Sequence, residues 1–168
     1  MFVCAASLIF ACADDGDGSM FEPRSGAWDF SGSAPVDDTC NYEDLYTDQP
    51  GTFVLDNNGD GTFTVTAGDN VFECTISGLT FSCPERLFGE NDVGAAAGLD
   101  AIVSYHVSVT GSFASETEMS GRQLFSLDCE GADCATVEAV VGVMTPCGWR
   151  RTSAPKRSSD HSAALGSE

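Results

Sequence analysis

The chain has 168 residues, which fits one domain with enough residues to bury a core, and 42% of them are hydrophobic. Its formal net charge is −19, and all but two of its 26 acidic residues precede residue 150. A surface this acidic repels nucleic acid phosphates and anionic lipid head groups. We therefore exclude nucleic acid as a partner and expect contact with a membrane only through an attached lipid.

An apolar run opens the chain and is too short to span a bilayer. We interpret residues 1–12 as an export signal that takes no part in the fold. Residues 13–25 are rich in Asp, Gly and Ser and predict a flexible acidic linker.

The end of the apolar run, Ile9-Phe10-Ala11-Cys12, resembles the lipobox of bacterial lipoproteins. The resemblance implies that Cys12 carries a lipid, becomes the mature N-terminus and anchors the protein in the bacterial cell envelope. The alternatives are ordinary secretion, with cleavage near Ala11 or Ala13, and a buried first strand.

Short alternating segments make up the predicted domain, residues 26–149. Alternation of apolar and polar residues predicts strands, and Asn, Asp and Gly between them predict tight turns. Gly121 is expected to mark a bulge or a bend inside its strand. The segments without a clear period predict two long loops, the first pinned at Cys40, and no stable helix is expected. The expected strands are residues 26–31, 52–56, 62–66, 72–77, 80–83, 101–113, 117–129 and 134–145, and the expected loops are residues 32–51 and 84–98.

About eight short strands joined by consecutive hairpins predict an all-β fold, an antiparallel up-and-down barrel. A β-sandwich is the alternative. Residues 150–168 hold four of the seven basic residues and have no apolar period, so we expect a disordered basic tail. We expect the protein to be a monomer.

The eight cysteines predict disulfides and therefore an oxidising compartment. Two of them, Cys4 and Cys12, lie in the apolar run, which leaves six for the domain. Zinc binding is the competing interpretation, but no two of the six have the tight spacing of a zinc site and no His lies beside them.

Local spacing suggests a pairing, although six cysteines allow many. Cys74 lies opposite Cys83 if the turn is centred on residues 78–79, whereas a turn centred on residues 77–78 pairs Cys74 with Phe81. The remaining expected bridges are one across a short turn and one from the front of the domain to its end, namely Cys129 to Cys134 and Cys40 to Cys147.

Residues 56–61 fill the first half of an EF-hand calcium loop, with Asp56, Asn58 and Asp60 at the ligand positions. The twelfth position is Ala67, so the bidentate Glu is missing, and strands flank the loop. We interpret this segment as a hairpin turn, with a weak calcium site as the alternative, and expect no other cofactor.

No catalytic residue is predicted. His106 is the only His of the predicted domain and lies on the polar face of a strand. The cysteines of the domain are assigned to bridges, and no G-x-S-x-G nucleophile motif occurs. We therefore expect a non-enzymatic protein. The distant alternative is a hydrolase that uses paired carboxylates such as those of Glu116 and Glu118.

The first strand begins with Gly26-Ala27-Trp28, which resembles the G-x-W signature of lipocalins. The resemblance implies an eight-stranded barrel that holds a small apolar ligand. It also implies that Trp28 closes the base of the barrel and that a basic residue beyond the last strand, Arg150 or Arg151, packs on it. An avidin-like barrel, or any β-domain that opens with a core Trp, shares these features. The alternative to a small ligand is a protein partner that contacts the acidic loops.

Overall fold

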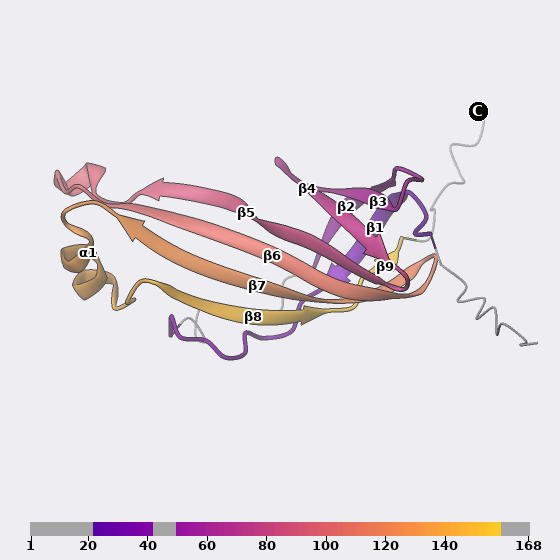
Figure 1. Ribbon diagram of the computed structural model, residues 1–168. Helices are drawn as coiled ribbons and strands as arrows, with labels where there is room; N and C mark the ends of the chain where they lie inside the picture. The colour runs from indigo at the N-terminus through magenta and orange to yellow at the C-terminus, as the bar shows by residue number, and fades with distance from the viewer. Residues whose placement is uncertain (1–21, 42–49, 159–168) are drawn as a thin grey trace, which may run out of the picture.

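Nine strands form one antiparallel sheet that closes into an eight-stranded barrel (Figure 1). The computed structural model describes residues 22–41 and 50–158. Two helices interrupt the described strands, the 3-10 helix η2 (Ala95–Ala97) and α1 (Cys134–Val141). The strands are β1 (Gly26–Ser31), β2 (Pro50–Asn57), β3 (Thr62–Ala67), β4 (Asn70–Ser77), β5 (Thr80–Asp92), β6 (Ile102–Ser115), β7 (Glu118–Glu130), β8 (Cys147–Ser153) and β9 (Lys156–Arg157).

The ring closes through the last two strands. Both β8 and β9 pair with β7, first at Ser153 and then at Lys156, so together they form the eighth strand of the barrel. On its other side β9 pairs with β1, with Arg157 as the register partner of Trp28. The consecutive strands β1 to β7 are all antiparallel neighbours, which confirms the predicted up-and-down barrel and excludes the sandwich.

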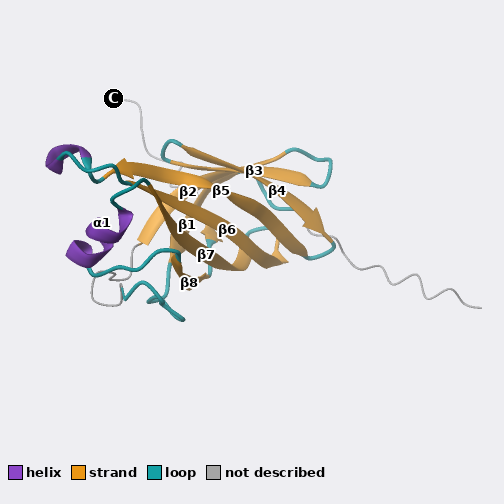
Figure 2. Cartoon of the chain, turned by 60° about the vertical axis from the view of Figure 1, so that its left-hand side comes forward, coloured by secondary structure: helices purple, strands orange, loops and turns teal. Residues whose placement is uncertain are grey.

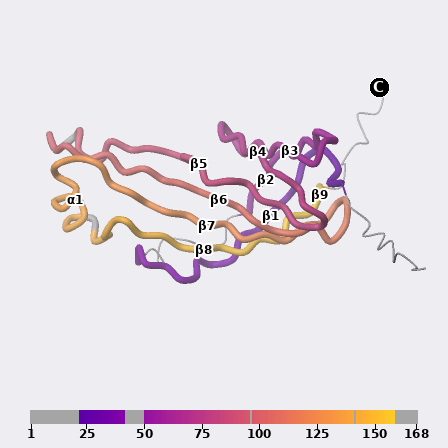
Figure 3. Tube along the Cα trace, in the orientation of Figure 1, coloured from indigo at the N-terminus to yellow at the C-terminus, as the bar shows by residue number. Residues whose placement is uncertain are grey.

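Strand length divides the molecule into two parts (Figures 1 and 3). Strands β5, β6 and β7 have 13, 14 and 13 residues, whereas β1 to β4 have between 6 and 8. We refer to the part where β1 to β4 and β9 complete the ring as the closed end. The part of β5 to β8 that runs on to the two helices is the extended end, as Figure 2 also shows.

The predicted hairpins between β2 and β5 are confirmed, and the register of the last one is settled. Ser77 pairs with Thr80, so the turn is centred on residues 78–79. Gly78 has a φ of +60°, which is the left-handed conformation that glycine adopts at little cost. This register places Cys74 opposite Cys83, and the two form a disulfide with a Cα–Cα distance of 4.2 Å.

The prediction of a loop at residues 84–98 is wrong, because most of this segment belongs to β5. This strand pairs with β6 from Thr80 to Asp92, but its register shifts twice, between Cys83 and Arg86 and between Leu87 and Gly89. A β-bulge inserts an extra residue and breaks the strict alternation of the two faces. The period-2 pattern that identifies strands is therefore lost over this stretch.

The strand expected at residues 134–145 is also wrong. Residues Cys134–Val141 form α1, and Gly142 ends the helix in the left-handed conformation with φ +77°. Its backbone N–H donates to the carbonyl of Glu138. Gly142 thus serves as a C-cap, the position at which glycine favours a helix end, and does not weaken the helix from within.

Residues on both flanks of the predicted domain are ordered against the barrel. Residues 150–157, expected in a basic tail, form the end of β8 and β9. Of the expected linker, Pro23 is fully buried and the backbone N–H of Arg24 donates to the carbonyl of Glu116 at 2.9 Å. The predicted lipidation site Cys12 and the export signal lie outside the described residues.

The three expected disulfides are present. Besides Cys74–Cys83, they are Cys40–Cys147, which joins residues 107 positions apart, and Cys129–Cys134, which ties the end of β7 to the start of α1. These bridges are compatible with an extracellular or cell-envelope location.

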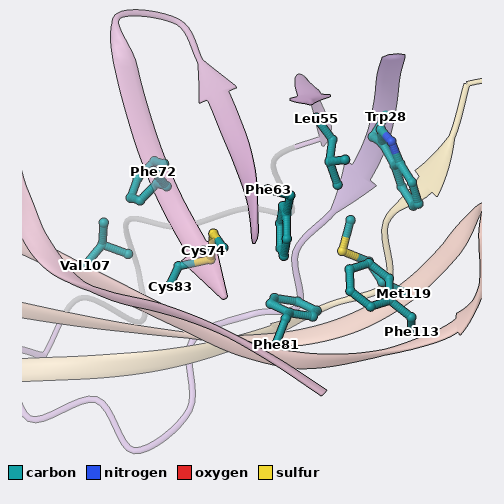
Figure 4. Packing of buried hydrophobic residues seen from close by; sticks show 10 residues of the cluster. All are labelled: Trp28, Leu55, Phe63, Phe72, Cys74, Phe81, Cys83, Val107, Phe113 and Met119. Atoms are coloured by element: carbon teal, nitrogen blue, oxygen red, sulfur yellow. A yellow bond between two sulfur atoms is a disulfide. The ribbon is translucent and has the colours of Figure 1, made fainter. Parts of the chain in front are cut away.

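Two clusters of buried side chains form the core. The closed-end core contains Trp28, Leu55, Phe63, Phe72, Cys74, Phe81, Cys83, Val107, Phe113 and Met119 (Figure 4). The extended-end core contains Cys40, Val103, Leu127, Val143, Cys147 and Trp149. Each core thus includes one buried disulfide.

Gly121 packs in the closed end and does not mark the expected bulge. It pairs in regular register with Gly111 on β6 and Ser153 on β8. A Cβ atom on Gly111 would lie 2.5 Å from the ring of Phe81, and one on Gly121 would lie 3.6 Å from it. The two glycines therefore leave the space that the Phe81 ring occupies.

Candidate functional site

A cavity of about 530 Å³ lies inside the barrel between the two cores. Ligand pockets of proteins typically have roughly 300–1,000 Å³ and mostly apolar walls. Aromatic side chains dominate the wall, among them Phe30, Phe53, Phe72, Phe88, Phe125 and Trp149. Phe88 is 44% exposed, so the cavity reaches the surface beside β5.

The floor of the cavity is the closed-end core (Figure 4). The rings of Phe63, Phe81 and Phe113 pack against one another with centroids 5.1 to 5.7 Å apart, two of the three pairs being edge-to-face. Such aromatic pairs add stability beyond the area that they bury. The phenylalanines fill the closed end of the barrel, and the cavity lies next to them on the side of the extended end.

The wall toward the extended end is flat and aromatic. Phe125 on β7 and Trp149 on β8 are register partners, and their rings stack with centroids 5.0 Å apart and planes at 6°. Across the barrel, the ring of Phe72 stacks with that of Phe88 at 6.5 Å and carries the guanidinium of Arg86 5.0 Å from its centroid. Both aromatic pairs line the cavity and give it flat apolar surfaces that suit an apolar molecule.

A polar corner interrupts the apolar wall beside Trp149. Arg151 is 7% exposed and is the only charged residue among the described residues that line the cavity. Its register partner on β7 is Gln123, and Ser153 follows two residues later on β8; all three line the cavity. The prediction of a tail from residue 150 onward hides this corner, because β8 continues through Ser153. The alternation of Cys147, Trp149 and Arg151 on one face is the signal that reveals it.

The surroundings of Trp28 correct one prediction. Trp28 is fully buried, and its indole N–H donates to the carbonyl of Arg24 at 3.1 Å. The basic residue beside it is Arg157, whose Nε–H donates to the carbonyl of Ser25 and whose guanidinium would lie 3.3 Å from a Cβ at Gly26.

Arg150 lies elsewhere in the barrel and does not pack on Trp28. It pairs in register with Leu124 on β7 and forms an ion pair with Asp37. The prediction failed because the last strand continues through residue 157, past the place where the sequence pattern suggested that it ended.

The turn with the calcium-loop pattern is held together by its own hydrogen bonds. Asp60 Oδ1 accepts from the hydroxyl and the backbone N–H of Thr62 at 2.5 and 3.0 Å, and the hydroxyl in particular lowers the pKa of Asp60. Asn58 donates its side-chain amide to the Thr62 hydroxyl, whereas Asp56 lies in β2 and pairs with Thr64. Within the described ranges, no group of three or more His, Cys, Asp or Glu side chains is placed to hold a metal ion.

The candidate catalytic residues lie on β6, in the turn that follows it and at the start of β7. His106 is half-buried on β6 between Leu87 and Ser126 of the neighbouring strands, on the face opposite to the cavity residues Tyr105 and Val107. Glu116 and Glu118 each form an ion pair, with Arg24 at 2.6 Å and with Lys156 at 2.9 Å. Neither set lines the cavity.

No family model, no curated protein and no solved structure matches the chain. Neither helix in residues 22–41 and 50–158 has the length and apolar character needed to cross a membrane. The cavity and its lining residues are therefore the features that bear on function.

Proposed function

We propose that the protein is a non-enzymatic carrier or receptor that binds a small apolar ligand inside its barrel. The supporting observation is the cavity of about 530 Å³ with its aromatic walls. A barrel that served only as a scaffold for protein contacts would gain stability by filling this volume, because interiors are normally close-packed. Here the phenylalanines fill only the closed end and leave the remaining space open.

The place of action that we propose is the bacterial cell envelope or its surroundings. The three disulfides support an oxidising compartment, and the resemblance of residues 9–12 to a lipobox supports a lipid on Cys12. The resemblance to lipocalins is part of this proposal, supported by the barrel and by the Trp28 and Arg157 pair at its closed end. A lipid-anchored or secreted barrel of this kind would hold its ligand outside the cytoplasm.

Binding of the neutral dye Nile red tests the proposal. We expect its fluorescence to rise on binding to the wild-type protein. Val109→Phe adds volume inside the cavity, where Val109 is a wall residue, and we expect it to weaken binding about tenfold, since overpacking costs ~1–3 kcal/mol. Thr110→Phe is the matched control, because Thr110 is exposed on the other face of the same strand. Equal binding by both variants, or none by the wild type, would contradict a ligand site in the barrel.

Intact mass tests the location. Protein expressed in bacteria with its complete N-terminal run should carry a lipid on Cys12 and gain the mass of six hydrogens, about 6 Da, on reduction of its three bridges. An unprocessed N-terminus would contradict the anchor, and free thiols at the six domain cysteines would contradict the compartment.

A further inference from the structure

Aromatic side chains are concentrated on the wall of the cavity. Among the residues that the structure describes, every Phe, Trp and Tyr side chain lines the cavity except those of Trp28 and Phe113. The described Leu and Ile side chains all lie elsewhere, and Met119 is the one Met of the wall. The large apolar side chains that a ligand would contact are therefore almost all flat rings.

These rings hold one another in place. Phe53 stacks on the buried ring of Trp28 with centroids 6.3 Å apart and planes at 12°, and Phe30 packs on Phe53 at 6.1 Å. Phe125 and Trp149 form a second stack at 5.0 Å. An aromatic side chain has only two torsions, and its ring contacts restrict both, whereas Met side chains adapt to the shape of a ligand. The wall thus offers preformed flat surfaces in fixed positions.

The polar side chains of the wall are spread over four strands. They are Asn91 on β5, Tyr105 on β6, Gln123 on β7, and Arg151 and Ser153 on β8. The described wall thus has no single polar end that would bind the head group of a chain-like lipid. The rings are the feature of this wall that can select one class of apolar molecule over another.

We propose that the ligand carries a planar aromatic ring system and that the rings of Phe125 and Trp149 pack against it. This inference rests on the proposed function, since it names the class of ligand for the same cavity. Aromatic rings attract one another in offset-stacked and edge-to-face arrangements, because the negative face of one ring meets the positive edge of the other. A saturated ring lacks this charge distribution, and its puckered shape does not lie flat on an aromatic surface.

The test compares naphthol with its fully hydrogenated form, decahydronaphthol. The two compounds share a carbon skeleton and a hydroxyl group, but only naphthol is flat and aromatic. Both compete with Nile red for the wild-type protein, and we expect naphthol to bind about 3- to 10-fold more tightly, the range that an aromatic pair adds beyond the area it buries. Both are uncharged at neutral pH, so the acidic surface does not bias the comparison.

A variant assigns the preference to the wall, since the naphthol hydroxyl is also the stronger hydrogen-bond donor. Phe125→Leu keeps an apolar side chain and removes the ring, so it should bind decahydronaphthol as the wild type does and lose most of the preference for naphthol. Leu124→Ala is the control and should keep the preference, because Leu124 is 46% exposed and lies outside the cavity wall on the same strand. A preference that survives in Phe125→Leu, or that Leu124→Ala also loses, overturns the assignment to this ring pair.

The wild-type comparison decides the class of ligand even if Phe125→Leu fails to fold. Equal affinity for the two compounds, tighter binding of decahydronaphthol, or no competition by either overturns the aromatic ligand class, while binding of Nile red leaves the proposed function standing. Failure of all three compounds to bind overturns the proposed function itself.

Discussion

The two ends of the barrel use aromatic side chains in different ways. At the closed end, Phe63 and Phe81 are 1% and 6% exposed and pack edge-to-face with each other. Toward the extended end, Phe88 is 44% exposed and Phe125 stacks flat on Trp149 at the cavity wall. The first group fills the closed end and forms the floor of the cavity, whereas the second forms its wall, although β5 carries a member of each, Phe81 and Phe88. The alternation of residues along a strand does not distinguish the two groups of rings. What distinguishes them is the number of strands that surround each ring: the whole barrel at the closed end, and fewer strands toward the extended end.

This difference has an energetic consequence. Substitutions at the closed end should act on stability, because close-packed side chains leave no room to adjust. Substitutions at the cavity wall should act on binding, because neighbouring volume is already empty. The following predictions compare the two ends in order of decreasing effect.

The largest single effect is expected from the removal of a buried disulfide. Replacing Cys40 and Cys147 by Ala opens a loop of 107 residues and should lower the free energy of unfolding by about 5 kcal/mol in the chain-entropy model. Replacing Cys74 and Cys83 by Ala opens a loop of 9 residues and should cost about 2.5 kcal/mol. Both pairs are buried, so the loss of packing is similar. Denaturant unfolding measures both, and the reverse order would show that the extended end contributes little to global stability.

The second comparison concerns two phenylalanines. Phe63→Ala should lower the free energy of unfolding by about 3–5 kcal/mol, because it leaves a cavity in the closed-end core. Phe88→Ala should cost less than about 1 kcal/mol, because its ring is already partly exposed, and should weaken binding of Nile red. Denaturant unfolding and dye titration of the same two variants provide both readouts. Similar stability losses would contradict the division into a filled and an open end.

The third comparison concerns two glycines on neighbouring strands. A Cβ atom on Gly111 would lie 2.2 Å from the carbonyl oxygen of Ser120, so Gly111→Ala should destabilise by about 1–3 kcal/mol. At Gly89, which lines the cavity, a Cβ atom meets nothing within 4 Å, and Gly89→Ala should be close to neutral. Thermal unfolding of the two variants makes this comparison, and equal melting temperatures would contradict the packing described for the closed end.

The smallest effect concerns acid stability. The Thr62 hydroxyl lowers the pKa of Asp60 at the closed end, and the Thr145 hydroxyl lowers the pKa of Glu138 at the extended end. A carboxylate with a lowered folded-state pKa stabilises the fold above its ordinary pKa, and this contribution is lost as the pH falls through the folded-state value. Thr62→Ala should therefore raise the pKa of Asp60 alone, and Thr145→Ala should raise that of Glu138 alone. Each variant should be only slightly less stable to acid than the wild type. NMR titration of the two carboxyl groups checks the direction, and unchanged pKa values would contradict these hydrogen bonds.

The features that the sequence could predict are those fixed by neighbouring residues. The hairpins between β2 and β5 follow from turn residues such as Gly78, and that register brings Cys74 to Cys83. The bulged β5 escaped prediction because its partner β6 holds it in place despite the broken alternation. Helix α1 escaped prediction because the sequence alone does not show whether Gly142 lies within a helix or at its end.

The candidate site likewise has some residues that the sequence could place and others that it could not. Trp28 was expected in the core and is buried there. The place of Arg151 on the interior face could not be predicted, because it depends on pairing with Gln123, 28 positions earlier in the chain. The size of the cavity could not be predicted at all, since it depends on how many strands complete the ring beside each phenylalanine.

The position of β9 has a consequence for how the protein is made. The barrel closes where Trp28 and Asp29 of β1 pair with Arg157 and Lys156 of β9. This edge of β1 therefore stays unpaired until the last strand has been synthesised. During synthesis on a ribosome, β1 to β7 can form hairpins in turn while the seam stays open. The bond between Cys40 and Cys147 depends on equally late residues. A chaperone that shields the unpaired edge of β1 in the meantime would protect the protein at the stage when it is most prone to aggregate.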